Sequence, residues 1–198
     1  MRVVVAHPGK QHSFRLAGAL NKYNYLDKYI TTVYDKDGSF VMSLIKKVVN
    51  KTNSERAGKR RTNEITDAQV IQYNQMQGLL LLLVLRIHHT KGRAFYNYLS
   101  RRISDSFGRK VARYAIKNKV NAVICYDANA TTCFKYLKAN APDIIRIMDN
   151  AAPNRYGLYQ EYQRINRKYG IIDRHPGAFK KYLTDETNAV TYRNEACL

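Results

Sequence analysis

The residues best suited to chemistry follow three apolar segments of strand length. After residues 2–6 comes the loop HPGKQH, residues 7–12, which combines two imidazoles, a cation and a glycine. A glycine lets the backbone approach a ligand, and the free N–H groups of a helix that starts here attract anions. The loop therefore suits a phosphate or a sugar hydroxyl, although a tight turn from strand to helix explains the same residues. It has neither the Walker spacing nor that of a dinucleotide-binding glycine motif.

Each of the other two segments is followed by a carboxylate with an amide close by. They are Asp127 and Asn129 after residues 121–126, and Asp149, Asn150 and Arg155 after residues 144–148. A carboxylate can accept the proton of a sugar hydroxyl, and an amide can hold that hydroxyl in place. Asp and Asn also cap helices that follow strands, so each pair has a structural interpretation as well. Two such pairs beside a histidine-containing loop shift the balance toward the chemical interpretation.

Strands and helices that alternate along the chain must position these residues. The apolar runs predict strands at 2–6, 29–34, 121–126 and 144–148. Helical spacing is present at 13–20 and 131–140, and a strand, a helix and a second strand form a right-handed parallel crossover. The sequence therefore predicts the α/β class, with a Rossmann-like, doubly wound parallel sheet. Ligands of such sheets bind beyond the carboxyl ends of the strands, which is where the polar segments fall.

The middle of the chain has a helical pattern. We expect a helix over 67–98 that is interrupted or bent near Gly78 and Gly92, and a continuation over 95–118. Apolar residues three and four apart define one buried face of that continuation: Phe95, Leu99, Ile103, Phe107, Val111 and Tyr114. The apolar run 79–85 predicts a buried helix, because it is far shorter than the roughly 20 residues that span a bilayer. More helix is expected after Pro153, with no further strand.

The charge balance is the anomaly in an otherwise globular composition. The 198 residues include 34 Lys+Arg and 15 Asp+Glu, a formal net charge of +19. Such an excess attracts polyanions, which include nucleic acid, an anionic membrane surface and phosphorylated substrates. We interpret residues 41–65 as a basic, partly helical insertion on the surface. Its expected membrane or anion contacts are Lys46, Lys47, Lys51, Lys59, Arg60 and Arg61.

The cysteines and the N-terminus indicate a cytoplasmic protein. Cys125, Cys133 and Cys197 form no Cys-x-x-Cys pair, and the apolar surroundings of Cys125 predict a buried thiol. The first residues are too short an apolar stretch for a signal peptide. Adjacent His88 and His89 cannot both face one metal ion from a helix, so no metal site is expected. The basic insertion is the candidate for a peripheral contact with the inner face of the membrane.

Three segments carry a resemblance to a known family. They are MRVVVAHPGKQHSFRLAGAL at the start, NAVICYDANATTCFKYLK in the middle and PDIIRIMDNAAPNRYGLYQEYQ after it. The chain resembles the N-terminal half of a bacterial glycosyltransferase of family 4, which has the GT-B architecture. The resemblance covers most of residues 1–34 and 110–198.

The resemblance implies two Rossmann-like domains that face a cleft, the first holding the acceptor and the second the nucleotide-sugar. Residues 1–198 then form a single acceptor-side domain, cut off at its C-terminus and without the nucleotide-sugar domain. The loop of Gly9, Lys10 and Gln11 corresponds to the family's loop near the donor diphosphate and the acceptor. Asp127 and Asp149 lie at strand ends where relatives commonly carry a histidine or a His-Asp pair, and are the expected catalytic residues. Substrate-binding residues are expected to be His7, Gly9, Lys10, Gln11, His12, Asn129, Asn150 and Arg155.

The leading hypothesis is therefore the acceptor-binding half of a retaining glycosyltransferase of cell-surface polysaccharide synthesis, inactive alone. It would transfer a sugar from a nucleotide-sugar to a glycan or lipid-linked acceptor, with no metal and no other cofactor. The alternative is a non-enzymatic, basic α/β protein that binds nucleic acid, because the 16 tyrosines are interleaved with Lys and Arg. Against it, the chain has no helix-turn-helix, RNA-recognition or zinc signature.

Overall fold

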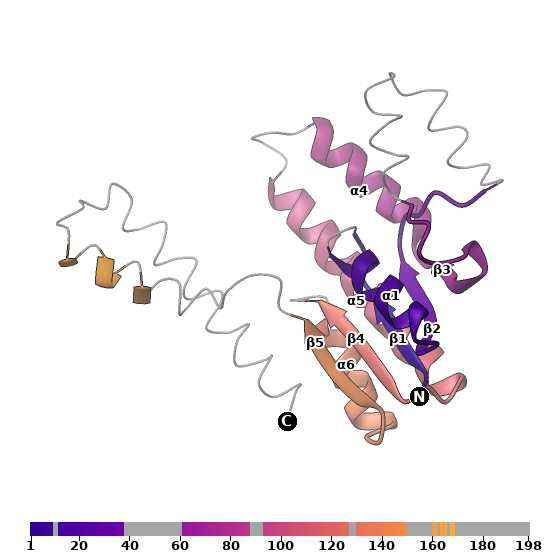
Figure 1. Cartoon of the computed structure of the whole chain (residues 1–198). Helices are drawn as coiled ribbons and strands as arrows, with labels where there is room; N and C mark the ends of the chain where they lie inside the picture. Colours follow the sequence, from indigo (N-terminus) through magenta and orange to yellow (C-terminus); the bar gives the residue numbers. More distant parts are fainter. Residues whose placement is uncertain are drawn as a thin grey trace.

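The chain builds a parallel β-sheet covered by helices on both faces (Figure 1). The structure is a computed structural model. It describes residues 1–9, 12–37, 61–87, 93–126, 130–149, 160, 161, 163–165, 167 and 168. Within these residues the elements are β1 (Val3–Ala6), α1 (Ser13–Lys22), β2 (Leu26–Thr31), η1 (Asp67–Gln69), β3 (Val70–Gln72), α4 (Gln75–Ile87), α5 (Arg93–Lys117), β4 (Ala122–Tyr126), α6 (Ala130–Asn140) and β5 (Ile145–Asp149).

The strand order creates a switch point at the centre of the sheet. Across the described strands the order is β3-β2-β1-β4-β5, and every neighbouring pair is parallel. The chain winds outward from β1 to β3, then crosses back to β4 on the other side of β1. In open parallel sheets ligands bind at this reversal, beyond the carboxyl ends of the strands. The predicted α/β class and its doubly wound, Rossmann-like sheet are confirmed.

Alternate residues of the central strand supply two separate cores. Val3 and Val5 of β1 pack with Phe14 and Ala17 of α1. Val4 and Ala6 point to the other face, where they join the apolar residues of α5 and α6. Both faces of β1 and β4 are thus buried, and this is why these strands are continuous apolar runs rather than alternating ones. Cys125 and Cys133 are buried free thiols in the second core.

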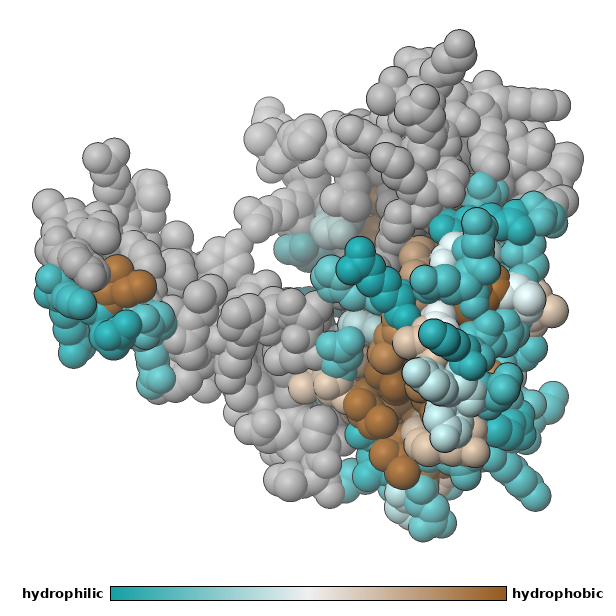
Figure 2. All heavy atoms as spheres, in the orientation of Figure 1, coloured by the Kyte–Doolittle hydropathy of each residue, from teal (hydrophilic) through white to brown (hydrophobic). Residues whose placement is uncertain are grey.

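The edge strand β5 is covered on one face only. Met148 packs against the core formed with α5 and α6, whereas Ile145 and Ile147 are exposed on the α1 face. Figure 2 shows apolar atoms gathered over this part of the sheet.

The second strand begins and ends earlier than the sequence predicts. β2 spans Leu26–Thr31, whereas the pattern indicated residues 29–34. Asn24 takes a left-handed conformation with φ of 58°, which turns the chain out of α1 so that the strand starts at once. Val33 and Tyr34 are buried although they lie beyond the ladder, which explains why they looked like strand residues.

The helix predicted from residue 67 begins later in the structure. Residues 67–72 instead form η1 and the short strand β3, which pairs with Tyr29–Thr31 of β2. Three residues are too few to show the alternation by which strands are recognised. Gly78 lies inside α4 rather than at a bend, and a Cβ there would be 2.6 Å from Oγ1 of Thr32. The glycine therefore permits α4 to pack closely on the residue that follows β2.

The predicted buried face of α5 is correct only where the helix lies on the sheet. Ile103, Phe107 and Val111 are buried, but Phe95 is 57 % exposed. The apolar run on α4 also differs from the prediction, because Leu80 is exposed. α4 and the start of α5 extend past the carboxyl ends of the strands (Figure 1). None of the described helices combines the length and apolarity needed to cross a bilayer.

Candidate functional site

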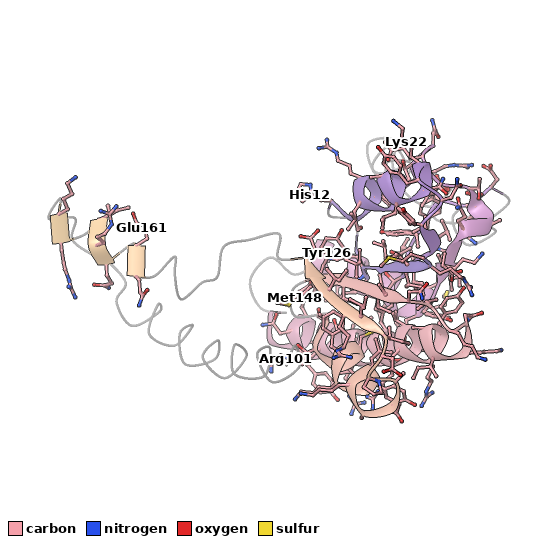
Figure 3. All side chains as sticks on the ribbon, turned by 60° about the horizontal axis from the view of Figure 1, so that its bottom comes forward. His12, Lys22, Arg101, Tyr126, Met148 and Glu161 are labelled. Atoms are coloured by element: carbon pink, nitrogen blue, oxygen red, sulfur yellow. The ribbon has the colours of Figure 1, made fainter. Side chains whose placement is uncertain are left out.

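The candidate site lies at the switch point, where three strand ends and the start of α1 meet. His7 directly follows β1, Tyr126 ends β4, and Asp149 ends β5 beside Tyr126 in the ladder. Tyr126 belongs to the core on the α1 face, and its register places Asp149 on the same face. In Figure 3, Tyr126 and His12, the residue before α1, lie at the same end of the sheet. We call His7, Tyr126, Asp149 and the start of α1 the switch-point cluster.

His7 holds the described part of the loop after β1 in one shape. The imidazole is buried, and its Nδ1 accepts a hydrogen bond from the backbone N–H of Gly9 at 2.8 Å. Because Nδ1 accepts, Nε2 carries the ring hydrogen and the imidazole is neutral in this arrangement. A Cβ on Gly9 would lie 3.0 Å from Cε1 of His7, so the glycine allows this close return of the chain.

Two threonines fasten the same loop to the end of β2. The Thr32 hydroxyl donates to the carbonyl of Pro8 at 2.5 Å, and the Thr31 hydroxyl donates to the carbonyl of Gly9 at 3.4 Å. Together with the His7 bond, these contacts fix the backbone that approaches the ligand site before any ligand arrives. A fixed loop loses little conformational entropy on binding.

Tyr126 brings an unsatisfied phenol into the cluster. The side chain is fully buried, and its hydroxyl has no hydrogen-bond partner in the described part of the chain. Its ring meets that of His7 edge to face, with centroids 5.2 Å apart. Burial, and then the negative charge of Asp149, raise the pKa of Tyr126, so the phenol keeps its proton at neutral pH. The phenol is thus a protonated hydrogen-bond donor close to the Asp149 carboxylate.

Asp149 and the start of α1 complete the cluster with opposite charges. Asp149 is half-buried, so its carboxylate can accept a hydrogen bond from a ligand hydroxyl at the sheet edge. α1 has no side-chain cap at His12 and no acidic residue in its first turn, so its N–H groups keep their partial positive charge. Ser13, in that first turn, is bonded through Oγ to the Tyr29 hydroxyl at 2.9 Å. The cluster therefore offers an acceptor, a neutral donor and a positive helix end.

The structure brings together some of the residues predicted from sequence. His7, Gly9 and Asp149 meet at the switch point, and His12 is exposed at the start of α1. The predicted site residues outside the described chain are Lys10, Gln11, Asp127, Asn129, Asn150 and Arg155. Tyr126 was not predicted, because a tyrosine at the end of an apolar strand has the pattern of a core residue. The available signal was its place directly before the polar segment that follows β4.

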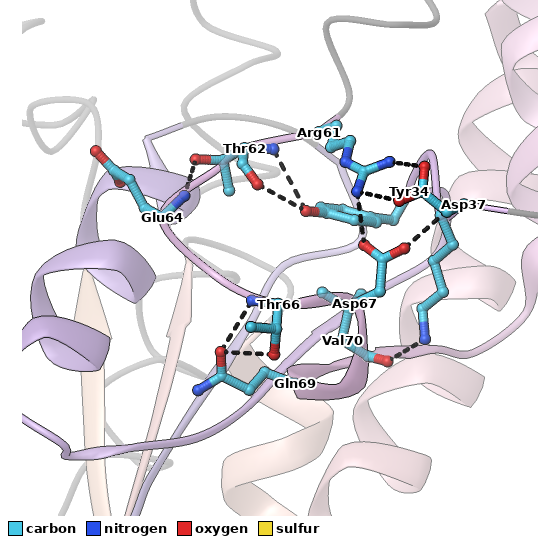
Figure 4. Close-up of polar contacts among 10 residues, drawn as sticks. Tyr34, Asp37, Arg61, Thr62, Glu64, Thr66, Asp67, Gln69 and Val70 are labelled. Carbon is cyan, nitrogen blue, oxygen red and sulfur yellow. Dashed lines mark hydrogen bonds and ion pairs between the residues drawn. The ribbon is translucent and has the colours of Figure 1, made fainter.

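Arg61 does not present a free charge in the structure. Its guanidinium binds both carboxylate oxygens of Asp37 and lies 3.6 Å from Asp67 (Figure 4). Asp67 also accepts a hydrogen bond from the backbone N–H of Asp37 at 2.7 Å. Arg61, expected to contact an anion, therefore ties residues 37 and 61 together. The other expected contacts fall outside the described residues: Lys46, Lys47, Lys51, Lys59 and Arg60.

The end of the predicted insertion belongs to the body of the protein. Tyr34 accepts a hydrogen bond from the backbone N–H of Thr62 at 3.3 Å and donates to its carbonyl at 3.2 Å. Ile65 is buried in the core on the α1 face. Residues 61–65 were predicted to belong to the exposed insertion, but Ile65 is part of the core. A single apolar residue in a polar segment gives no pattern from which its burial could be predicted.

Together, the fold and the cluster define an α/β protein of the doubly wound class with a polar site at its switch point. No protein-family model matches this chain, and no curated protein has a matching sequence. Among the residues that the structure describes, no three His, Cys, Asp or Glu side chains are grouped to hold a metal ion.

Proposed function

We propose that this chain is the acceptor-side domain of a retaining GT-B glycosyltransferase, which transfers a sugar from a nucleotide-sugar to a glycan or lipid-linked acceptor. The observation that carries the proposal is the meeting of His7, Tyr126 and Asp149 at one sheet edge. These residues come from the three segments that resemble family 4, and the segments are far apart in sequence. The strand order makes β1, β4 and β5 neighbours, so all three segments contribute to one site.

The chemistry of the cluster suits a sugar acceptor. A sugar presents hydroxyls, which both donate and accept, and the cluster offers the Asp149 carboxylate as acceptor and the Tyr126 phenol as donor. In the transfer, the acceptor oxygen bonds to the anomeric carbon while the bond from that carbon to the diphosphate breaks. We assign Asp127 and Asp149 to the acceptor hydroxyl, which must lose its proton in this step. The positive start of α1 and Lys10 are assigned to phosphate oxygens.

Sugar transfer by the complete protein tests this proposal. The protein is incubated with UDP- and GDP-sugars labelled in the sugar, together with a glycolipid extract of the source organism's membranes. We expect label to enter the extract, and Asp149→Asn to lower the rate by about 100-fold. The matched control is Asp143→Asn. Asp143 is an exposed aspartate that lies just before the amino end of β5, whereas Asp149 lies at its carboxyl end.

Two results would overturn the proposal. One is the absence of transfer from every nucleotide-sugar, accompanied by tight binding of arbitrary nucleic acid that falls steeply with salt; this would favour the nucleic-acid alternative. The other is an equal loss of rate in Asp149→Asn and Asp143→Asn. Thermal unfolding of both variants checks that neither has lost its fold.

A further inference from the structure

The outer face of α5, the second helix of the α4–α5 hairpin, carries a line of aromatic and basic side chains. Successive residues of an α-helix are about 100° apart, so side chains at positions 95, 98, 102, 109 and 113 lie within an arc of about 60°. Phe107 and Val111, which are buried in the core, lie on the opposite side of the helix. We call the exposed residues of the line the α5 stripe: Phe95, Tyr98, Arg102, Arg109 and Arg113.

The arginines of the α5 stripe keep their positive charge without a partner carboxylate. In the described part of the chain, none of the three forms an ion pair. Asp105 lies three positions after Arg102 and four before Arg109, but it accepts a hydrogen bond from Oγ1 of Thr132 at 2.5 Å instead. Arg109 and Arg113 are like charges one turn apart, an arrangement that disfavours a helix. The stripe is therefore a concentration of positive charge that the described residues do not neutralise.

Two of these arginines are held against tyrosine rings. The Arg102 guanidinium lies 5.1 Å from the centre of the Tyr98 ring, and the Arg113 guanidinium lies 5.9 Å from the centre of the Tyr136 ring of α6. A guanidinium above a ring is held in position, but it keeps its charge and its N–H donors. Those donors have no acceptor among the described residues. The stacked arginines are therefore preorganised to bind the oxygen atoms of an anion such as phosphate.

We propose that the α5 stripe binds single-stranded nucleic acid without reading its sequence. The arginines bind backbone phosphates, and unpaired bases stack on the exposed rings of Phe95 and Tyr98. From Phe95 to Arg113 the stripe is about 27 Å long, enough for several nucleotides. The net charge of +19 adds long-range attraction to a polyanion. We expect no sequence preference, because the chain has no sequence-reading signature.

The distribution of rings and charges favours a nucleic acid over a bilayer. A helix that lies on a bilayer presents apolar residues to it along one whole face. The apolar face of α5 is instead buried in the core, with Phe107 and Val111, and the rings of the stripe occupy only the start of the helix. Guanidiniums that follow one another along a line suit a polymer with one phosphate in each unit, and the adjacent rings suit planar bases.

The α5 stripe is separate from the switch-point cluster. α5 contributes to the core on one face of the sheet, whereas Tyr126 belongs to the core on the other face, with α1. A nucleic acid on the stripe and a sugar acceptor at the cluster therefore use different side chains, and the inference does not rest on sugar transfer. Asp149→Asn, which should slow sugar transfer, should leave nucleic-acid binding unchanged.

Fluorescence anisotropy of a labelled oligothymidylate of about 12 nucleotides, titrated with the full chain, tests the inference. We expect binding that weakens as salt rises. Arg109→Gln with Arg113→Gln should make the slope of log K against log salt shallower by about 1.4, because each phosphate contact on a single strand contributes about 0.7. Phe95→Ala with Tyr98→Ala should weaken the binding about 30-fold or more through lost stacking, with little change in the salt slope.

Matched controls come from α1 and the turn after it. Arg15→Gln with Lys22→Gln removes two exposed cations, and Tyr23→Ala with Tyr25→Ala removes two exposed tyrosines, all remote in sequence from α5. Both control pairs should bind the oligonucleotide almost like the wild type, and thermal unfolding should show that all four pairs are folded. An equal loss in control and stripe variants would show general charge attraction and overturn the inference.

Two further probes separate the occupants of the stripe. A DNA duplex of the same length hides its bases, so it should bind more weakly than the single strand, and equal affinity for both would contradict stacking on the rings. Vesicles of phosphatidylglycerol and phosphatidylcholine test a bilayer. Vesicle binding that is lost in Arg109→Gln with Arg113→Gln, without oligonucleotide binding, would assign the stripe to lipid and overturn the inference. Since the oligonucleotide is titrated without any nucleotide-sugar, its failure to bind is distinct from a failure of the sugar-transfer assay.

Discussion

The switch-point cluster and the α4–α5 hairpin depart from ordinary burial in opposite directions. In the cluster, polar groups of His7 and Tyr126 are buried. In the hairpin, apolar groups such as Met76 and Phe95 are exposed. A buried donor without a partner carries a free-energy cost and is rare in folded proteins, whereas an exposed apolar side chain is common. The buried Tyr126 hydroxyl, which has no partner among the described residues, is therefore the more informative of the two departures.

The largest expected effect separates two phenylalanines of one helix. Phe107 of α5 is 2 % exposed, and replacing it with alanine should lower the free energy of unfolding by about 3–5 kcal/mol. Phe95→Ala, on the exposed hairpin end of the same helix, should change it by less than about 0.5 kcal/mol. Denaturant unfolding of both variants measures the difference. A large loss in Phe95→Ala would show that the hairpin end is part of the core.

The buried tyrosines make stability sensitive to alkaline pH. Burial raises the pKa of Tyr126 above the usual 10.0, so the unfolded chain releases its proton at a lower pH than the folded chain. The stabilisation is fully present below pH 10.0 and is lost as pH rises toward the folded pKa. The unfolding free energy of the wild type should fall above pH 10.0, with Tyr126 contributing up to about 1.4 kcal/mol per pH unit. Tyr126→Phe should show a shallower fall, and an unchanged slope would contradict burial of the phenol.

Tyr29 and Tyr126 differ in whether the hydroxyl has a hydrogen-bond partner among the described residues. Tyr29 shares a hydrogen bond with Ser13, so Tyr29→Phe should cost about 1 kcal/mol of unfolding free energy. Tyr126 has no such partner among the described residues, so Tyr126→Phe should leave stability unchanged at neutral pH or raise it slightly. The same Tyr126→Phe variant should lower sugar transfer. Calorimetry and the transfer assay together measure both effects, and a stability loss in Tyr126→Phe alone would point to a purely structural phenol.

The smallest effect compares two arginines with different partners. Arg61 is bound by Asp37 and Asp67, so Arg61→Gln should lower the unfolding free energy by a small but measurable amount. Arg102 is stacked on the exposed Tyr98 ring, so Arg102→Gln should leave the unfolding free energy almost unchanged. Denaturant unfolding of both variants measures the difference. The opposite ranking would contradict the distinction between an arginine bound by two carboxylates and one stacked on an exposed ring.

The sequence predicted the centre of the fold better than its margins. β1 and β4 were found because buried parallel strands are continuous apolar runs, and α1 and α6 because one apolar face recurs at helical spacing. The partly exposed edge strand β5 was found from its own short run rich in Ile and Met. β3 was missed since three residues carry no period. Phe95 was placed in the core because spacing reveals an apolar face but not whether anything covers it. That information belongs to the tertiary structure.

Part of the candidate site was also within reach of the sequence. His7 and Asp149 were identified because polar residues directly after apolar strands mark the carboxyl edge of a parallel sheet. Their meeting depended on the strand order, which places β1, β4 and β5 side by side. Tyr126 required the structure, because only burial and the missing hydrogen-bond partner distinguish its phenol from that of a core tyrosine.

Thr32 contacts both the loop after β1 and helix α4. Its hydroxyl holds the carbonyl of Pro8 in the loop after β1, and its side chain lies directly against Gly78 of α4. Thr32 is therefore in contact with both α4 and the loop that shapes the switch-point cluster. A substitution of Thr32 would alter the packing of α4 and the position of this loop at the same time.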